Sequence, residues 1–564
     1  MHIIKRQEAG TNHSLARNSR STFFKHMRIP IYIIGLLLSI SVQNIFAQNN
    51  LTYLLSGDRL ASSPYVEPTP FHNTDIENSA VHLMRENTAL FHFLQSLNDS
   101  STYFKSRRRD NVNILKSSIN HVNTSGKYLS YNGCKLFDGD IAASGTYRTN
   151  HGTIFGNATY IYRGKDGVKY NYATQPELYN PYFVGDTLSK GWLRQEIYYL
   201  KGGYGFRLGR LYYGIDALYE GIAQSRPDNP KQSNYSYWLT LGLNMAYVHR
   251  QNLYAIKVTP ELNRQSISAN TVSDGIRFFQ FYGFGQWHRQ ESKGTLAYGR
   301  TQKIEGVTTE MLWQRDGKTK SKWAVATHLS YNYRHACTEE TSFKNLFELH
   351  THRFSQQVVL DRRFESSSLH IQLTGNENVK KGVENIYENQ IQNKEQYIYD
   401  AKKVGSGQLY KARSQSVDLR AKYILPLSIG HQVYMMAAAN YYGYQESYVS
   451  PRMKIINHSF SPSLGTGYAM SNTKNNLVAD LLLDMRQGIK NYYSVPIPFD
   501  KFVDAHAYTP YLLRGENAQR LSMRMGYARK IKGRQWFGIE TILSYMRSDY
   551  RKITAMHCSL FYLF

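Results

Sequence analysis

The best candidate for a catalytic group is the run Asn457-His458-Ser459-Phe460, because a serine nucleophile beside a histidine base is the usual chemistry of ester hydrolysis. Adjacent side chains of an extended strand point to opposite faces, so His458 and Ser459 would not reach the same bond. Outer-membrane phospholipases use a run of the type His-x-Ser-Asn-Gly instead. We therefore interpret the run as a strand or strand end and expect no enzymatic activity, with a lipid hydrolase as the alternative.

Charged residues recur on the polar faces of predicted strands. Asp480 and Asp484 share a face with Arg486, but two carboxylates four residues apart in a strand are about 13 Å apart along the chain. That separation is too long for acid/base work on one water molecule. We expect these side chains to form ion pairs or to line a wet interior, together with a further set of charged residues: Asp216, Glu220, Lys257, Arg524 and Glu540.

The three cysteines give no sign of a metal centre. Cys134, Cys337 and Cys558 lie far apart, without a C-x-x-C spacing or a paired histidine register. We therefore predict no metal site, no disulfide framework and no cofactor.

The elements that must position these residues are strands. In "YWLTLGLNMAY", residues 237–247, Tyr, Leu and Met alternate with Trp, Thr, Gly, Asn and Ala over about the 9 to 11 residues of a transmembrane strand. The same alternation recurs at 211–220, 477–486 and 521–527, and the chain holds 46 tyrosines, which suit membrane-interface girdles. A soluble sandwich would also alternate, but it would rarely end its strands on regularly spaced tyrosines. We predict a transmembrane antiparallel β-barrel of about 18 to 20 strands.

The predicted connections separate into two kinds. Short turns at "TNHG", "FRLGR", "HRQN", "RQES", "LSIG" and "IKGRQ" fall on one rim of the barrel, and long polar connections fall on the other. The long connections are expected at 165–190, 376–406 and 487–516. This separation is typical of outer-membrane barrels, which have short periplasmic turns and long outer loops.

The N-terminal part divides into a leader and a pre-barrel segment. Lys25 and Arg28 precede the apolar run "IPIYIIGLLLSISV", which is shorter than the roughly 20 residues of a membrane-spanning helix. We predict a signal peptide over 1–47, cleaved between Ala47 and Gln48, with Met27 as a second candidate start. Residues 48–118 carry a helical pattern and could form a short plug, a periplasmic cap or a partly ordered tail. The barrel is expected over 119–564.

The charge and the C-terminus indicate partners. The net charge of +26 is scattered, and no nucleic-acid-binding motif accompanies it, so we expect contacts with outer-membrane lipid, lipopolysaccharide or a surface glycan or protein, and none with nucleic acid.

The last nine residues, "MHCSLFYLF", place apolar side chains on alternate positions up to the terminal Phe564. Leu560, Tyr562 and Phe564 resemble the signal that barrel-assembly machinery recognises in its clients.

Three longer stretches support a family resemblance. "KLFDGDIAASGTYR", "YATQPELYNPYFVGDTLSKG" and "GGYGFRLGRLYYGIDALYEGIAQSRPDNP" resemble uncharacterised outer-membrane β-barrel proteins of Bacteroidetes, catalogued as a domain of unknown function. The resemblance implies a fold and a location in the cell outer membrane, with no activity attached. From size alone we expect a porin-like passive channel or small-solute transporter with a mixed-charge lumen. The alternatives are a surface-binding or scaffold subunit and, less favoured, a TonB-dependent receptor, which uses about 22 strands and a larger plug.

Overall fold

The structure is a computed structural model, and it describes residues 88–90 and 113–564. Short stretches of the second range are outside the description: 150, 183, 187–190, 229–230, 250, 272–277, 281–295, 316–322, 341–342, 365, 394–397, 429, 451, 473, 497–502 and 533–534. The predicted signal peptide, its cleavage point at Ala47 and Gln48, and most of the predicted pre-barrel segment also lie outside the described residues. No helix among the described residues is long and apolar enough to cross a membrane.

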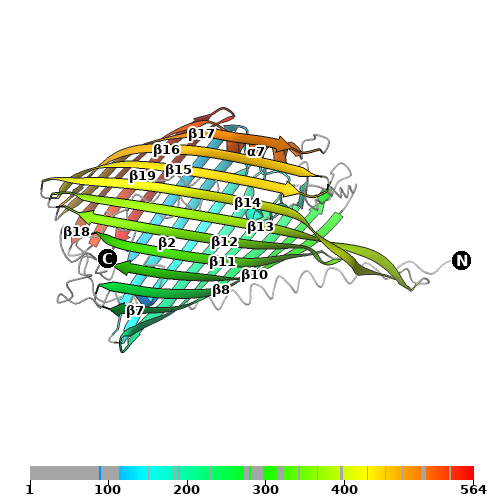
Figure 1. Ribbon diagram of the computed structural model, residues 1–564, viewed down its shortest axis with the longest axis horizontal. Coiled ribbons are helices and arrows are strands. Elements are labelled where there is room, and N and C mark those ends of the chain that lie inside the picture. The colour runs from blue at the N-terminus through cyan, green and yellow to red at the C-terminus, as the bar shows by residue number, and fades with distance from the viewer. Residues whose placement is uncertain are drawn as a thin grey trace. The chain divides into compact units, whose positions relative to one another are not determined.

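The described chain forms a closed antiparallel barrel of 18 strands, which confirms the predicted fold (Figure 1). Sequence neighbours pair with one another around the barrel, and the first strand pairs with the last. Two further short strands, β4 and β9, pair only with each other. The elements are β1 Ile114–Gly126, β2 Lys135–Arg148, β3 Gly152–Asp166, α5 Pro176–Tyr179, β4 Val184–Asp186, β5 Leu193–Leu208, β6 Leu211–Arg226, β7 Lys231–His249, β8 Asn252–Thr271, β9 Phe278–Gln280, β10 Leu296–Arg315, β11 Ala324–Glu340, β12 Phe343–Arg363, β13 Ser368–Asn393, β14 Ile398–Ser428, β15 His431–Tyr448, β16 Met453–Ser471, β17 Asn475–Ser494, η4 Asp504–Tyr508, α7 Thr509–Gly515, β18 Ala518–Lys532, β19 Gln535–Ser548 and β20 Arg551–Leu563.

Most strands of the barrel have an exposed apolar face and a buried, largely polar face. On β7, Leu239, Leu241 and Leu243 are 46%, 46% and 51% exposed, whereas Ser236 and Asn244 on the other face are buried. The same contrast holds on most strands of the barrel, so the apolar side chains cannot be a core. An apolar outer surface suits a lipid bilayer. A closed sheet suits it too, because no backbone edge is left unpaired.

The two rims differ in the way that we predicted. The short-turn rim carries the chain ends of the barrel and the turns β2–β3, β5–β6, β7–β8, β14–β15, β16–β17 and β18–β19. The opposite rim, called here the long-loop rim, carries the long connections 167–192, 272–295 and 495–517. Five of the six predicted short turns fall on the short-turn rim. The sixth predicted short turn, "RQES", lies outside the described residues.

The prediction of a long loop at 376–406 is wrong. Strands β13 and β14 stay paired through this region, from Asn376↔Ser416 to Asn393↔Ile398, with three register shifts. The ribbon extends beyond the neighbouring strands on the long-loop rim (Figure 1). Its sequence is rich in polar residues, so composition alone indicated a loop. Strand β1 begins at Ile114, ahead of the expected barrel boundary at 119.

The last strand closes the barrel. β20 pairs with β1 from Ile114↔Leu563 to Gly126↔Arg551 and with β19 on its other side. Beyond the end of β20, the backbones of Phe564 and Asn113 exchange two hydrogen bonds of 3.1 and 3.2 Å. Leu560 is exposed on the outer face of β20, where the half-buried rings of Tyr562 and Phe564 stack with centroids 5.5 Å apart.

Deletion of Phe564 is expected to reduce the amount of heat-modifiable protein in the outer membrane, because it removes the terminal aromatic and the last backbone pair of the closing strand. The measurement is gel mobility with and without heating, on membranes from cells expressing equal amounts of each chain. Phe564→Tyr is the matched control, since it keeps the aromatic ring and the backbone. Equal accumulation of the deletion variant and the control would contradict an assembly role for this residue.

Candidate functional site

Oppositely charged side chains on neighbouring strands form ion pairs on the inner face of the barrel wall. The Arg524 Nε donates to Asp480 Oδ2 at 2.6 Å, and the Arg524 Nη1 lies 3.8 Å from Glu540 Oε1. All three side chains are buried, and they come from β17, β18 and β19. Asp484 lies opposite Arg520 in the register of β17 and β18. This part of the wall therefore neutralises its own charges instead of presenting charge of one sign.

A second cluster binds part of the pre-barrel segment. The Thr88 hydroxyl donates to Asp216 Oδ2 at 2.6 Å, and the same carboxylate interacts with Asn244 at 2.7 Å and with the Lys257 ammonium at 3.4 Å. Ala89 and Leu90, in helical conformation, are fully buried in an apolar cluster that joins inward-facing side chains near the short-turn rim: Tyr212, Ala246, Leu253, Ala255, Leu312, Ala326 and Val359.

Gly214 shows how closely this segment approaches the wall. A Cβ at Gly214 would lie 2.4 Å from the backbone nitrogen of Ala89 and 2.7 Å from the carbonyl carbon of Thr88. Glycine is therefore required where the pre-barrel residues rest on β6. These contacts place residues 88–90 inside the barrel wall, in the position that a plug would occupy.

Residues 170–182, from the connection after β3, enter the interior from the long-loop rim. The carbonyl of Tyr172 accepts hydrogen bonds from the side-chain amides of Asn234 at 2.6 Å and Gln224 at 3.1 Å. The Thr174 backbone N–H donates to the Gln265 side chain at 2.8 Å. Inward-facing amides of β6, β7 and β8 thus satisfy the backbone of an irregular segment that would otherwise be buried without partners.

The same segment uses one of the predicted lumen residues. The Gln175 side chain donates to Glu220 Oε1 at 2.7 Å, so this carboxylate binds the segment instead of facing open water. The Tyr179 hydroxyl, on α5, donates to Asn263 Oδ1 at 2.7 Å. Burial raises the pKa of Tyr179, so its hydroxyl stays a donor.

The segment reaches β12 and β13, well around the barrel from β6 and β7. The ring of Tyr182 stacks on Phe347 of β12 with centroids 4.3 Å apart, and the Lys380 ammonium of β13 donates to the carbonyl of Glu177 at 2.8 Å. Tyr179 and Tyr182 also join an apolar cluster with inward-facing residues of β14, β15 and β16, among them Tyr410, Tyr448 and Ile455. Residues 170–182 therefore span the interior.

Residues 503–515 form a second inward segment, built from η4 and α7. The Asn457 side-chain amide donates to the carbonyl of Tyr511 at 3.1 Å, and the Arg486 Nη2 donates to the carbonyl of Arg514 at 2.6 Å. The Arg514 guanidinium lies 3.8 Å above the ring of Tyr444. The middle and the C-terminal end of α7 are therefore held to the wall, with Arg486 at the negative end of the helix.

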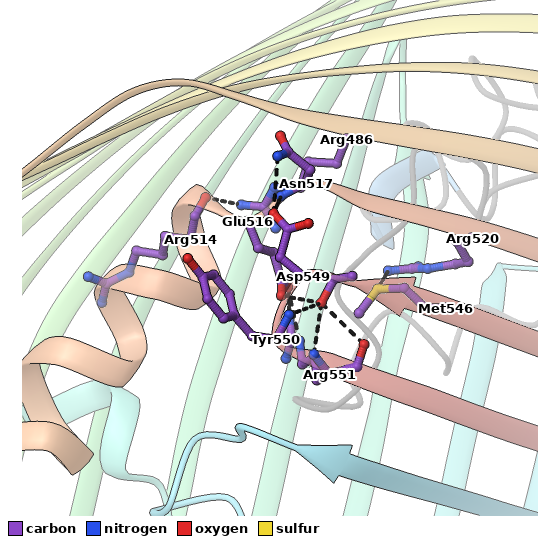
Figure 2. Close-up of polar contacts among 10 residues, drawn as sticks. Arg486, Arg514, Glu516, Asn517, Arg520, Met546, Asp549, Tyr550 and Arg551 are labelled. Atoms are coloured by element: carbon purple, nitrogen blue, oxygen red, sulfur yellow. Dashed lines mark hydrogen bonds and ion pairs between the residues drawn. The ribbon is translucent and has the colours of Figure 1, made fainter.

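A buried carboxylate fixes the chain directly after α7 (Figure 2). Glu516 is 1% exposed; it accepts from the Arg551 Nε at 2.9 Å and from the Ser548 hydroxyl at 2.6 Å. Next to it, the Asn517 side chain donates to Asp549 at 3.1 Å. The turn between β19 and β20 thus anchors the second inward segment to the closing strand.

The two inward segments meet at His506. Its imidazole stacks on Tyr131, of the β1–β2 connection, at a centroid distance of 6.3 Å and packs edge-on against Tyr170 at 6.0 Å. Burial lowers the pKa of His506 from its ordinary 6.5 to about 3, so the ring is neutral at physiological pH. The packing of the segments against each other therefore depends on an uncharged imidazole.

The predicted lumen residues are brought together in part. Asp216 joins Lys257, Asp480 joins Arg524 and Glu540, and Glu220 and Arg486 instead hold the two inward segments. Exposure of any of them to a water-filled passage stays a prediction. Sequence reasoning placed long connections at 165–190 and 487–516 but did not predict that residues 170–182 and 503–515 enter the interior. The first of these segments is rich in Tyr, Asn and Gln, which is a signal that could have found it.

The candidate hydrolase run is distributed over both faces of β16. Asn457 and Ser459 are buried on the inner face, whereas His458 lies between them on the outer face. The His458 Nδ1 lies 2.6 Å from the hydroxyl of Tyr441. This is the separation of histidine and serine that strand alternation predicts; the absence of enzymatic activity stays a prediction.

Comparison with known proteins gives a family but no activity. A model of a family of unknown function, DUF6850, matches residues 103–564. The chain belongs to this family. The match begins ahead of β1 and runs to the last residue, so it covers the whole barrel. No curated protein matches the DUF6850 chain.

Several solved structures that the chain resembles are named as receptors or transporters of ferric compounds. They include the ferric preacinetobactin receptor of Acinetobacter baumannii (9% identity, 80% of each chain, TM-score 0.32) and the ferric citrate transporter FecA (9%, 80% and 78%, 0.37). A third is the ferripyoverdine receptor of Pseudomonas aeruginosa (9% identity, 80% of this chain and 72% of that chain, TM-score 0.35). The barrel assignment of the DUF6850 chain rests on its own strand pairing.

Proposed function

We propose that this chain is an outer-membrane barrel with a gated interior, which admits or binds a small solute only when its inward segments move. The observation that carries the proposal is that residues 170–182 span the interior between walls that are well separated around the barrel. Residues 503–515 and 88–90 occupy further parts of the interior. A barrel of 16 to 18 strands can enclose a water-filled channel, so filling it with ordered segments points to control of passage. A permanently open channel, our expectation from size, is less well supported.

The proposed location follows from the lipid-compatible surface. Large apolar side chains are exposed on the outside of strands all around the barrel, including Ile215 on β6, Met435 on β15 and Leu543 on β19. In water such a surface would aggregate, whereas in a bilayer it is solvated. Partners that stay proposals are lipopolysaccharide, the barrel-assembly machinery and a surface glycan or protein, and the Bacteroidetes source is proposed from the sequence resemblance alone.

Acidification is expected to weaken the docking of residues 503–515 in the interior, because it protonates His506. The docked ring has a pKa near 3 and regains its ordinary 6.5 when the segment leaves the interior, so protonation favours the undocked state. Docking is therefore complete above pH 6.5 and weakens by about tenfold for each pH unit below it, until the pH approaches 3. The measurement is leakage of a small dye from proteoliposomes between pH 7.5 and 4.5.

His506→Gln is the matched variant for this experiment, because glutamine does not titrate. Its leakage should not change over the same pH range, and Tyr131→Phe should keep the wild-type response because the ring is retained. An identical rise in leakage for wild type and His506→Gln would contradict the role of this imidazole. A tight barrel at every pH would show that undocking needs more than one proton.

A surface-binding or scaffold role is the second candidate, and the β13–β14 ribbon favours it. The register of β13 with β12 ends at Glu384 and that of β14 with β15 ends at Tyr410, so the rest of the ribbon is a two-stranded extension of the barrel sheet. Replacing residues 386–405 with a short turn should abolish capture of a stoichiometric partner if this role is correct, and should leave dye leakage unchanged. Capture of the partner by the shortened chain would contradict the scaffold role of the ribbon and leave the gated barrel as the better-supported function.

A further inference from the structure

A group of metal-ligating side chains lies on the outer face of β11 and β12, near the long-loop rim. His335 on β11 and Glu348 and His350 on β12 each offer one ligand atom, and these atoms all lie within 4.8 Å of one another. The Nε2 of His335 lies 3.4 Å from the Glu348 Oε2, and the two imidazole rings stack at 4.7 Å. The histidines show no paired spacing along the sequence, because the pairing is between strands.

Strand register explains why the side chains converge. His335 pairs with His350, and the neighbouring outward position on each strand pairs Cys337 with Glu348. Two such cross-strand pairs, spaced by two residues, form a rectangle of about 5 by 7 Å on one face of the sheet. The inward-facing neighbours Ala336 and Leu349 are buried, whereas the four outward side chains are partly exposed on the surface of the barrel.

We propose that this group binds a divalent transition metal, with Zn²⁺ as the ion that its donor set suits best. Two imidazole nitrogens and one carboxylate oxygen are three of the usual ligands of zinc. A fourth is at hand, since the Cys337 Sγ lies 3.5 Å from the His335 Nε2. A tetrahedral site with three kinds of donor favours Zn²⁺ over Mg²⁺ or Ca²⁺, which take oxygen ligands almost exclusively.

Neighbouring side chains orient two of the ligands. The Asn385 amide, from β13, donates to the Glu348 Oε1 at 3.1 Å, which leaves Oε2 on the side of His335. The Tyr333 hydroxyl lies 3.0 Å from the His350 Nδ1, which leaves Nε2 for the metal. Such outer contacts hold ligand rings and carboxylates in place in metal sites. A bound ion would therefore tie β11 and β12 to the base of the β13–β14 ribbon.

Zinc binding by the purified full chain tests the proposal. Equilibrium dialysis in detergent should recover one equivalent of Zn²⁺ for wild type and for His352→Ala, which removes an outward histidine of β12 that is not in the group. His335→Ala and His350→Ala should each lose the ion. A wild-type chain that binds none, or variants that keep the full equivalent, would overturn the proposal and leave a His–Glu ion pair as the interpretation.

Two further variants keep the test independent of folding. Heat-dependent gel mobility of each variant reports an intact barrel, and Glu348→Gln, which keeps the size of the side chain and its contact with Asn385, should bind Zn²⁺ at least tenfold more weakly. The absorption spectrum of the Co²⁺-loaded chain then tests whether Cys337 is the fourth ligand. A thiolate-to-cobalt charge-transfer band should be present in wild type and absent in Cys337→Ser; a wild-type cobalt complex without that band would remove Cys337 from the site.

Discussion

Replacing both inward loop segments and removing the pre-barrel segment is expected to turn the closed barrel into a conducting pore. The variant carries Gly-Ser linkers of equal length in place of 170–182 and 503–515, and lacks residues 48–112. Each replaced segment fills a different part of the interior: the two loops enter from the long-loop rim, and Thr88 to Leu90 lie near the short-turn rim. An 18-stranded barrel without these segments has the size of a porin.

A factorial design separates the contributions. The loop replacement alone should give a small conductance in planar bilayers, because residues 88–90 still narrow the short-turn rim, and the 48–112 deletion alone should give little current, because both loops stay docked; only the combined variant should give a steady, porin-sized conductance. Gly-Ser replacement of the exposed outer-turn residues Val449 and Ser450 is the control and should stay closed. A combined variant that folds and does not conduct would show that the wall side chains themselves fill the barrel.

Arg524→Ala should produce the largest loss of stability from a single substitution. It leaves the carboxylates of Asp480 and Glu540 buried without their shared guanidinium, and breaking a buried ion pair in this way costs about 3 to 5 kcal/mol. The measurement is the free energy of unfolding in urea, followed by tryptophan fluorescence of the protein in lipid vesicles.

Two comparisons make the stability result specific. Arg529→Ala removes an exposed arginine from the same strand and should change the free energy of unfolding by less than about 0.5 kcal/mol. Adding Asp480→Asn and Glu540→Gln to Arg524→Ala removes the unpaired charges and should recover most of the loss. Equal effects of Arg524→Ala and Arg529→Ala would contradict a buried charge network.

The fold could be predicted because its signal is local and repeated. Residues 237–247 show which face of β7 meets lipid, and the parity of "MHCSLFYLF" matches the exposed Leu560 and the buried Phe561 of β20. Strand alternation also gave the opposite orientation of His458 and Ser459. These inferences need only a period of two, which does not depend on where a strand lies in the sheet.

The interior contacts could not be predicted, because they join residues far apart in the chain. Alternation places Glu220 and Arg486 on the inner face, but nothing local shows that their partners are Gln175 and the carbonyl of Arg514. The group at His335, Glu348 and His350 needs the register of β11 against β12, which depends on the turn between them. The β13–β14 ribbon was missed because its mainly polar sequence lacks the regular apolar–polar alternation that marks the other strands.

The most direct test of the gated barrel is the conductance of the chain with all of its interior segments unmodified. Purified protein is inserted into planar bilayers at pH 7.5, and the current is recorded at constant voltage without added solute. With residues 170–182 and 503–515 docked in the interior, we expect baseline current with at most brief openings. A steady conductance of porin size from the unmodified chain would contradict the central claim that its own segments close the barrel.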